Sequence, residues 1–139
     1  GETARTLKYH GIKCAGILAT DGTIQSKLLQ KEMEKSCIKA MIPNQADQRD
    51  VMNLIYGCIK SNRPVDIHRF HEIAAHLRKN GAEAIILGCT ELSLIKRDYL
   101  IGPGYLDVME VLAKMSIQAS GGKLKDIYTN LMIQHGNRP

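Results

Sequence analysis

The sequence predicts a three-layer α/β fold in which a parallel sheet of three or four strands lies between layers of helices. Three short apolar runs, at residues 12–19, 38–42 and 84–87, have the length of buried strands rather than of helices. Stretches in which apolar residues recur every three or four positions separate these runs, as expected for amphipathic helices. Strands that alternate with helices predict a parallel sheet with right-handed crossover connections.

Start and stop signals divide the chain into the expected elements. Gly11 ends the first helix, Pro43 ends the second strand, and Asp66 can cap the helix that stops before Gly81. Residues 1–104 are predicted to form the α/β domain, residues 105–120 a further helix and residues 121–139 a loosely held tail. Helices are expected at residues 2–10, 24–36, 46–60, 66–80, 107–119 and from 91 onward, and a loop with a short strand at 100–101 is expected over 96–104.

Composition excludes several classes of protein. The 139 residues are 44% hydrophobic and 24% charged, which is ordinary for a globular domain. The net charge of +5 is scattered, and with one Phe and no Trp it gives no support for nucleic-acid binding. No apolar stretch has the length of a membrane span, so no membrane partner is predicted. The four cysteines form no CxxC pair, which argues against zinc or disulfides and fits a cytoplasmic protein.

Cys89 follows the third apolar run, at the strand end where open α/β sheets place their ligands. Gly88 keeps bulk away from the thiol, and Thr90 can cap a helix that begins at Glu91. The positive end of that helix would lower the pKa of the thiol, which the charge of Glu91 opposes slightly. The residues alone leave open whether Cys89 is a reactive thiol or a small buried hydrophobic residue.

Two further positions are candidates for binding an anion. Residues 20–23 follow the first predicted strand and combine the hydroxyls of Thr20 and Thr23 with a helix start, an arrangement that favours carboxylate or phosphate. Many ordinary strand-to-helix turns look the same. Lys60 ends a predicted helix, where a solvated lysine that complements the helix dipole is the plainer interpretation. Because parallel strands end at one edge, Thr20 and Cys89 are predicted to share a crevice.

The segment Gly88-Cys89-Thr90-Glu91-Leu92 resembles the second cysteine motif of the aspartate/glutamate racemase family. The preceding Gly-Ala-Glu-Ala-Ile-Ile-Leu, the turn at residues 20–23 and the Ile-Tyr segment that precedes Lys60 resemble the same family. The resemblance implies one half of a two-domain fold in which each domain contributes one cysteine. One thiolate removes the α-proton of an amino acid, the other thiol returns a proton from the opposite face, and no cofactor takes part.

The resemblance also implies roles for residues around the catalytic Cys89. Thr20, Thr23 and Thr90 would hold one carboxylate of an acidic amino acid, and Lys60 would hold the other. Glu91 belongs to the same substrate-binding group. The helix at 107–119 departs from the family pattern, because Val108 and Met109 stand in place of threonines and Leu112 in place of a histidine.

The resemblance covers residues 2–120 and only the second domain of the family. We therefore expect a fragment or truncated product that is inactive alone, with the helix at 105–120 returning to the missing first domain. Apolar residues exposed on that helix would favour a homo-oligomer. Two alternatives stay open, a decarboxylase or maleate-isomerase-like enzyme of the same superfamily and a non-catalytic α/β interaction domain.

Other reactive side chains are predicted to stand outside the site. His68, His71 and His76 lack a completing carboxylate and a common helix face, so no metal site is expected. Cys14 begins the first strand and would lie at the opposite end of the sheet from Cys89.

Overall fold

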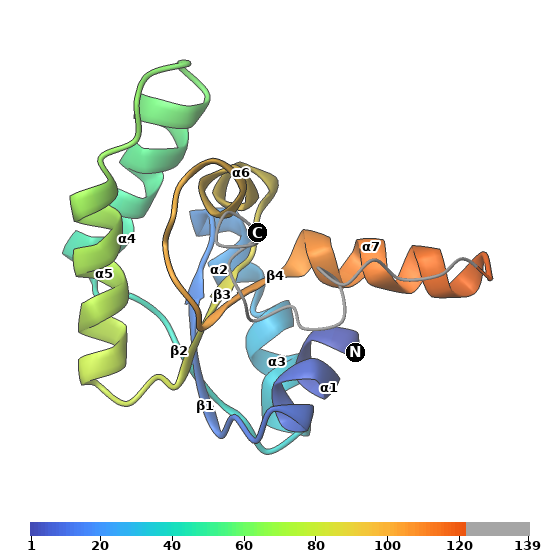
Figure 1. Cartoon of the computed structure of the whole chain (residues 1–139). Helices are drawn as coiled ribbons and strands as arrows, with labels where there is room; N and C mark the ends of the chain where they lie inside the picture. The colour runs from blue at the N-terminus through green and yellow to red at the C-terminus, as the bar shows by residue number, and fades with distance from the viewer. Residues whose placement is uncertain (122–139) are drawn as a thin grey trace.

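The central feature of the computed structural model, which describes residues 1–121, is a four-stranded parallel sheet with helices on both faces (Figure 1). This arrangement confirms the predicted fold class. All three pairings between neighbouring strands are parallel, so the four carboxyl ends meet at one edge. The strands are β1 (Cys14–Leu18), β2 (Lys39–Met41), β3 (Ala84–Leu87) and β4 (Tyr105–Asp107), in the order β2-β1-β3-β4.

Side chains that alternate along the strands pack into two separate hydrophobic clusters, one on each face of the sheet. Ile85 and Leu87 of β3 point to one face, and Ala84 and Ile86 point to the other. Helices α4 (Gln45–Met52), η1 (Asn53–Ile59), α5 (Ile67–Lys79) and α6 (Thr90–Asp98) pack on the first face. Helices α1 (Glu2–Tyr9), α3 (Leu28–Lys35) and α7 (Val108–Ala119) pack on the second, with α2 (Asp21–Ser26) at the edge.

The fourth strand differs from the sequence prediction, which placed a short strand at residues 100–101. The strand is Tyr105–Asp107, and it pairs with β3 through the register Ile85 to Tyr105. It has only three residues and follows two glycines with positive φ, Gly102 and Gly104. A strand this short has no periodicity of its own, so only its partner in the sheet defines it.

The helix predicted at residues 24–36 is two helices, because the chain turns at Lys27. Lys27 has a φ of 59°, in the left-handed region that ends helices. The hydroxyl of Ser26 donates to the carbonyl of Thr23 at 2.7 Å and accepts from the N–H of Leu28 at 3.4 Å. A serine side chain that bonds to nearby backbone competes with helical hydrogen bonds, which accounts for the break.

The helix predicted at residues 46–60 changes type in its second half. After α4, η1 forms a π-helix in which the N–H of Lys60 bonds to the carbonyl of Ile55 at 2.8 Å. Such wider turns are often found at functional sites.

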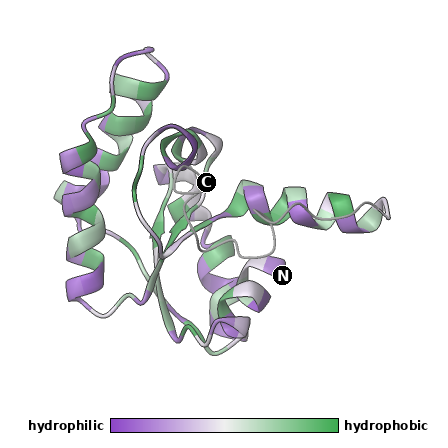
Figure 2. Cartoon of the chain, in the orientation of Figure 1, coloured by the Kyte–Doolittle hydropathy of each residue, from purple (hydrophilic) through white to green (hydrophobic). Residues whose placement is uncertain are grey.

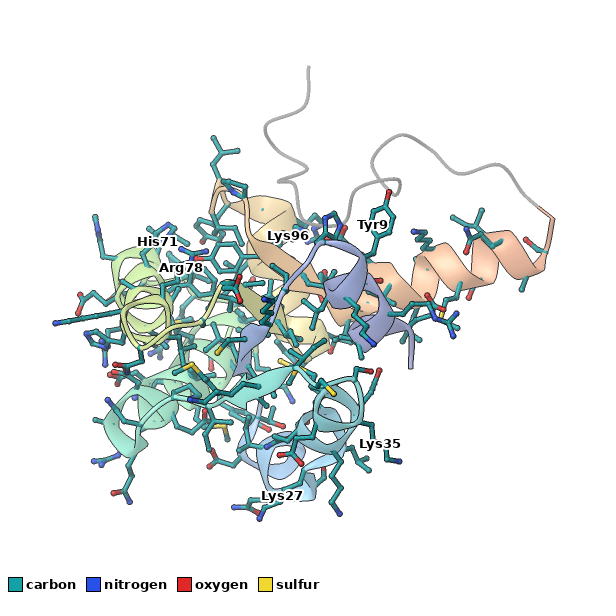
Figure 3. All side chains as sticks on the ribbon, turned by 90° about the horizontal axis from the view of Figure 1, so that it is seen from below. Tyr9, Lys27, Lys35, His71, Arg78 and Lys96 are labelled. Atoms are coloured by element: carbon teal, nitrogen blue, oxygen red, sulfur yellow. The ribbon has the colours of Figure 1, made fainter. Side chains whose placement is uncertain are left out.

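Residues 96–98 were expected to begin a loop but belong to α6. Lys96 is only 1% exposed, and its ammonium group lies 3.0 Å from the Glu110 carboxylate and donates to the carbonyl of Tyr105 at 3.0 Å. Figure 3 shows Lys96 in the interior, whereas Lys27 and Lys35 lie at the periphery. The sequence pattern placed the charge of Lys96 in solvent, but the lysine is buried because it pairs with Glu110.

Helix α7 extends away from the body of the protein (Figure 1). Asp107 caps it by accepting from the N–H of Met109 at 2.9 Å, which confirms the predicted helix at 107–119. Apolar and polar residues alternate along it (Figure 2), and Met109, Leu112 and Met115 are exposed. None of the helices within residues 1–121 is both long and apolar enough to cross a bilayer. Apart from residue 121, the predicted tail lies outside the described residues.

Candidate functional site

The carboxyl ends of β1 and β3 place two predicted turns side by side. Leu18 pairs with Leu87, and the N–H of Gly88 donates to the carbonyl of Leu18 at 2.8 Å. The residues that follow these two strands, Thr20 and Cys89, therefore leave the sheet as neighbours at one edge. This is the edge at which parallel α/β sheets bind ligands.

Gly88 allows the close approach of the two turns. A Cβ atom at this position would lie 3.1 Å from the Cβ of Ala19 and 3.3 Å from a methyl group of Leu29. Both distances are tighter than ordinary van der Waals contact. A side chain at position 88 would therefore force Ala19 and Leu29 to shift by a few tenths of an ångström.

The turn after β1 is organised by its own threonines. The Thr20 hydroxyl accepts from the N–H of Thr23 at 3.3 Å, and the two hydroxyl oxygens lie 3.1 Å apart. The side-chain amide of Gln48, on α4, donates to the carbonyl of Ala19 at 3.0 Å and to the Asp21 carboxylate at 2.9 Å. The role of Gln48 could not be predicted from the sequence, because its partners are 27 and 29 residues away.

Cys89 itself occupies the N-cap position of α6, in extended conformation. The prediction that Thr90 caps this helix is wrong. Thr90 is the first helical residue, and its hydroxyl donates to the Glu91 carboxylate at 3.0 Å. A helix beginning one residue earlier brings the thiol one position closer to its first turn.

The electrostatic surroundings of Cys89 differ from the expectation of an acidic thiol. Burial raises the pKa of Cys89 to about 11, and the negative charge of Glu91 adds to that effect. Hydrogen bonding by the backbone N–H groups of Leu92 and Glu91 lowers the pKa of Cys89 but does not outweigh burial. At neutral pH this side chain is therefore a protonated thiol.

Lys60 and Glu91 form an ion pair beside the thiol, with the ammonium nitrogen 3.3 Å from the carboxylate oxygen. The Lys60 ammonium group also lies 4.6 Å from the centre of the Tyr56 ring, a cation–π contact. The pKa of Glu91 is lowered chiefly by its own backbone N–H, with further hydrogen bonds from Thr90 and Lys60, against the opposing effect of burial. The lysine at the end of η1 is thus directed toward the Cys89 turn.

Ser93 and Asp107 adjoin the same turn and were not among the predicted site residues. The Ser93 hydroxyl donates to the Asp107 carboxylate at 2.6 Å and lies 3.3 Å from the carbonyl oxygen of Cys89. Asp107 ends β4 and is 3% exposed. The position of Ser93 one helical turn after Cys89 was the available signal, but its partner could be found only from the sheet.

Cys14 lies away from this edge, and His76 has a carboxylate partner of its own. Cys14 is the first residue of β1, at the opposite end of the sheet from Cys89, as predicted. His76 contacts the buried Asp47, with its Nδ1 2.6 Å from the carboxylate. Within residues 1–121 no cluster of three or more histidines, cysteines or carboxylates could hold a metal ion.

Comparison with protein families gives a match over most of the chain. Residues 1–116 match the family model described as Asp/Glu/Hydantoin racemase. An uncharacterized protein in the pnlA 3′ region of Pectobacterium carotovorum subsp. carotovorum is 30% identical over 118 residues, covering 84% of this chain and 79% of that protein. A protein named glutamate racemase from Shewanella loihica is 27% identical over 139 residues, covering 91% of this chain and 51% of that protein.

Solved structures show the same architecture. The aspartate racemase of Picrophilus torridus superimposes with a TM-score of 0.70 at 28% identity, covering 95% of this chain and 55% of that one. The chain therefore spans about half the length of this racemase and of the glutamate racemase from Shewanella loihica.

Proposed function

This chain belongs to the Asp/Glu/hydantoin racemase family, and we propose that it forms one side of the active site of a cofactor-independent racemase for an acidic amino acid. The observation that supports this most directly is the pairing of β1 with β3. It sets Cys89 beside the Thr20 turn at the carboxyl edge of the sheet. Proton transfer at the α-carbon needs an acid/base group within reach of a bound substrate, and here a thiol lies beside a turn suited to a carboxylate.

Cys89 acts in this proposal as the proton donor on its side of the substrate. Its raised pKa keeps the thiol protonated at neutral pH. The S–H bond breaks as the carbanion's electron pair takes the proton, which forms the new C–H bond and leaves a thiolate. In the reverse direction that thiolate removes the same proton.

Removal of the proton from the opposite face needs a second acid/base group, which we assign to the other half of the enzyme. The glutamate and aspartate racemases that this chain matches are about twice its length. In the family resemblance that group is a second cysteine. The isolated chain is accordingly expected to bind substrate but not to racemise it.

We assign the substrate's two carboxylates to two different groups of residues at the edge of the sheet. Thr20 and Thr23, with Thr90 of α6, hold the α-carboxylate through hydroxyl and backbone N–H groups. Lys60 holds the side-chain carboxylate, and Glu91 keeps the lysine extended toward it through their 3.3 Å ion pair. Such preorganised donors would stabilise the carbanion once the other half excludes water.

We assign the exposed apolar side of α7 to contact with that other half. Met109, Leu112 and Met115 are between 39% and 49% exposed and recur every three residues along the helix. With this surface uncovered, the isolated chain should self-associate. Sedimentation that shows a clean monomer at high concentration would contradict the assignment.

The decisive experiment measures exchange of the α-proton of L-aspartate and L-glutamate in D₂O by the natural gene product. We expect deuterium incorporation and inversion with one of these substrates, and loss of inversion in Cys89→Ser, because inversion needs a proton donor on each face. Cys14→Ser is the matched control and should keep full activity, because Cys14 lies at the far end of the sheet. Loss of carbon dioxide would instead indicate a decarboxylase, and an intact fold with no reaction would indicate an interaction domain.

A further inference from the structure

We propose that Ser93 and Asp107 are positioning residues for Cys89, an inference that rests on the function proposed above. A hydrogen bond between their side chains joins α6, the helix that begins beside the thiol, to β4 at the edge of the sheet. Neither residue is assigned to contact the substrate. Their effect would be to fix the first turn of α6 where the thiol can reach the α-carbon.

The contact between Ser93 and Asp107 is short, and the carboxylate oxygen accepts a second hydrogen bond. The Ser93 hydroxyl donates to Oδ1 of Asp107 at 2.6 Å, and the N–H of Met109 donates to the same oxygen at 2.9 Å. Asp107 is 3% exposed, so its carboxylate depends on such donors in place of water.

Asp107 stands on a rigid element. It ends β4 and pairs with Leu87, the last residue of the strand that leads to Cys89. The anchor and the thiol therefore follow neighbouring strands of one sheet. A side chain on a strand is held more precisely than a side chain on a loop, so Asp107 is a firm anchor for Ser93.

Ser93 transmits that position to Cys89 through the backbone. Its N–H donates to the carbonyl of Cys89 at 3.3 Å, and its hydroxyl oxygen lies 3.3 Å from the same carbonyl oxygen. The hydroxyl has one hydrogen, and the shorter contact shows that it is given to Asp107. Ser93 thus locks the turn that contains the N–H groups of Glu91 and Leu92, both of which act on the sulfur.

The test compares Ser93→Ala and Asp107→Ala with Asp107→Asn, which keeps an oxygen that can accept both hydrogen bonds. Site-resolved alkylation by iodoacetamide at about pH 8 is followed at Cys89 relative to Cys14. Loosening the first turn of α6 admits water to a thiol that burial protects. We expect the Cys89 to Cys14 ratio to rise about 3–10-fold in both alanine variants, stay within about twofold in Asp107→Asn, and stay unchanged in the surface control Ser120→Ala.

A parallel measurement uses the natural gene product, where Ser93→Ala should lower kcat about tenfold or more while KM changes less than about threefold. Unchanged alkylation ratios with only a lower melting temperature would show a purely structural contact and overturn the proposal. Asp107→Asn behaving like Asp107→Ala would overturn it too, because charge rather than position would then matter. Absence of any racemisation in the unmodified protein would refute the proposed function instead, and the alkylation ratios would still decide the positioning role.

Discussion

Replacement of Lys96 by methionine tests how the functional edge is held together. Lys96 is on α6, which begins beside Cys89, and it contacts the carbonyl of Tyr105 on β4 and the carboxylate of Glu110 on α7. Its side chain is 1% exposed and that of Glu110 is 9% exposed. One ammonium group therefore joins three elements that meet around the site.

The expected loss follows from what the substitution leaves behind. Methionine fills a similar volume, so little packing is lost, but the Glu110 carboxylate stays buried without its ammonium partner. Removing one member of a buried ion pair costs about 3–5 kcal/mol of unfolding free energy. In a domain of this size each kcal/mol lowers the melting temperature by roughly 3–5 °C, so Lys96→Met should melt about 10–20 °C below the unmodified chain.

Urea unfolding followed by circular dichroism measures this difference. Lys35→Met is the matched control, because Lys35 is exposed on α3, and it should stay within about 0.5 kcal/mol of the unmodified chain. The double variant Lys96→Met with Glu110→Leu should recover most of the loss, since an apolar pair can replace a buried ion pair. A single variant that costs less than about 1 kcal/mol would show that water reaches the pair, and the reasoning would be refuted.

Three further predictions concern the edge and its surroundings. At about pH 8 Cys89 should react with iodoacetamide roughly tenfold or more slowly than the exposed Cys37, and its rate should rise about tenfold per pH unit toward pH 10, as its pKa of about 11 requires. Burial opposes ionisation of Asp47, but hydrogen bonds from its histidine and arginine partners leave its pKa lowered, so its contribution to stability is present at neutral pH and lost as the pH falls below about 4. Urea unfolding should therefore show Asp47→Asn less stable than the unmodified chain at pH 7, with a difference that shrinks as the pH falls below about 4. Gly88→Ala should cost about 1–3 kcal/mol through its 3.1 Å contact, whereas Gly22→Ala, which meets nothing within 4 Å, should be neutral or stabilising by thermal melting.

Most of the fold could be predicted from the sequence because its buried strands are continuous apolar runs. Ala84–Leu87 is entirely buried, and so are the last four residues of β1, which is the pattern of strands covered on both faces. β4 could not be found in the same way, because three residues after two glycines become a strand only through pairing with β3. The break at Lys27 was missed because the left-handed residue that ends a helix is usually a glycine, and a lysine gives no such signal.

The neighbouring positions of Thr20 and Cys89 at one edge of the sheet could be predicted, but the pKa shift of Cys89 could not. Parallel topology alone was enough to bring Thr20 and Cys89 to one edge. The direction of the Cys89 pKa shift depends on how deeply the sulfur is buried against the sheet, which the helix-start argument cannot supply. Ser93 was missed because its partner Asp107, 14 residues away, is the last residue of a strand that the sequence did not reveal.

The groups proposed to bind substrate already have partners that a dicarboxylic amino acid could replace. The hydroxyls of Thr20 and Thr23 bond to each other, and the Lys60 ammonium group is held by Glu91. A substrate carboxylate would therefore meet donors that these contacts already hold in place. Cys89 is a neutral thiol in the same edge, so it adds no repulsion toward an incoming anion. The high pKa of this thiol therefore favours binding of the substrate before the proton is transferred, and the proton it retains is the one the carbanion needs.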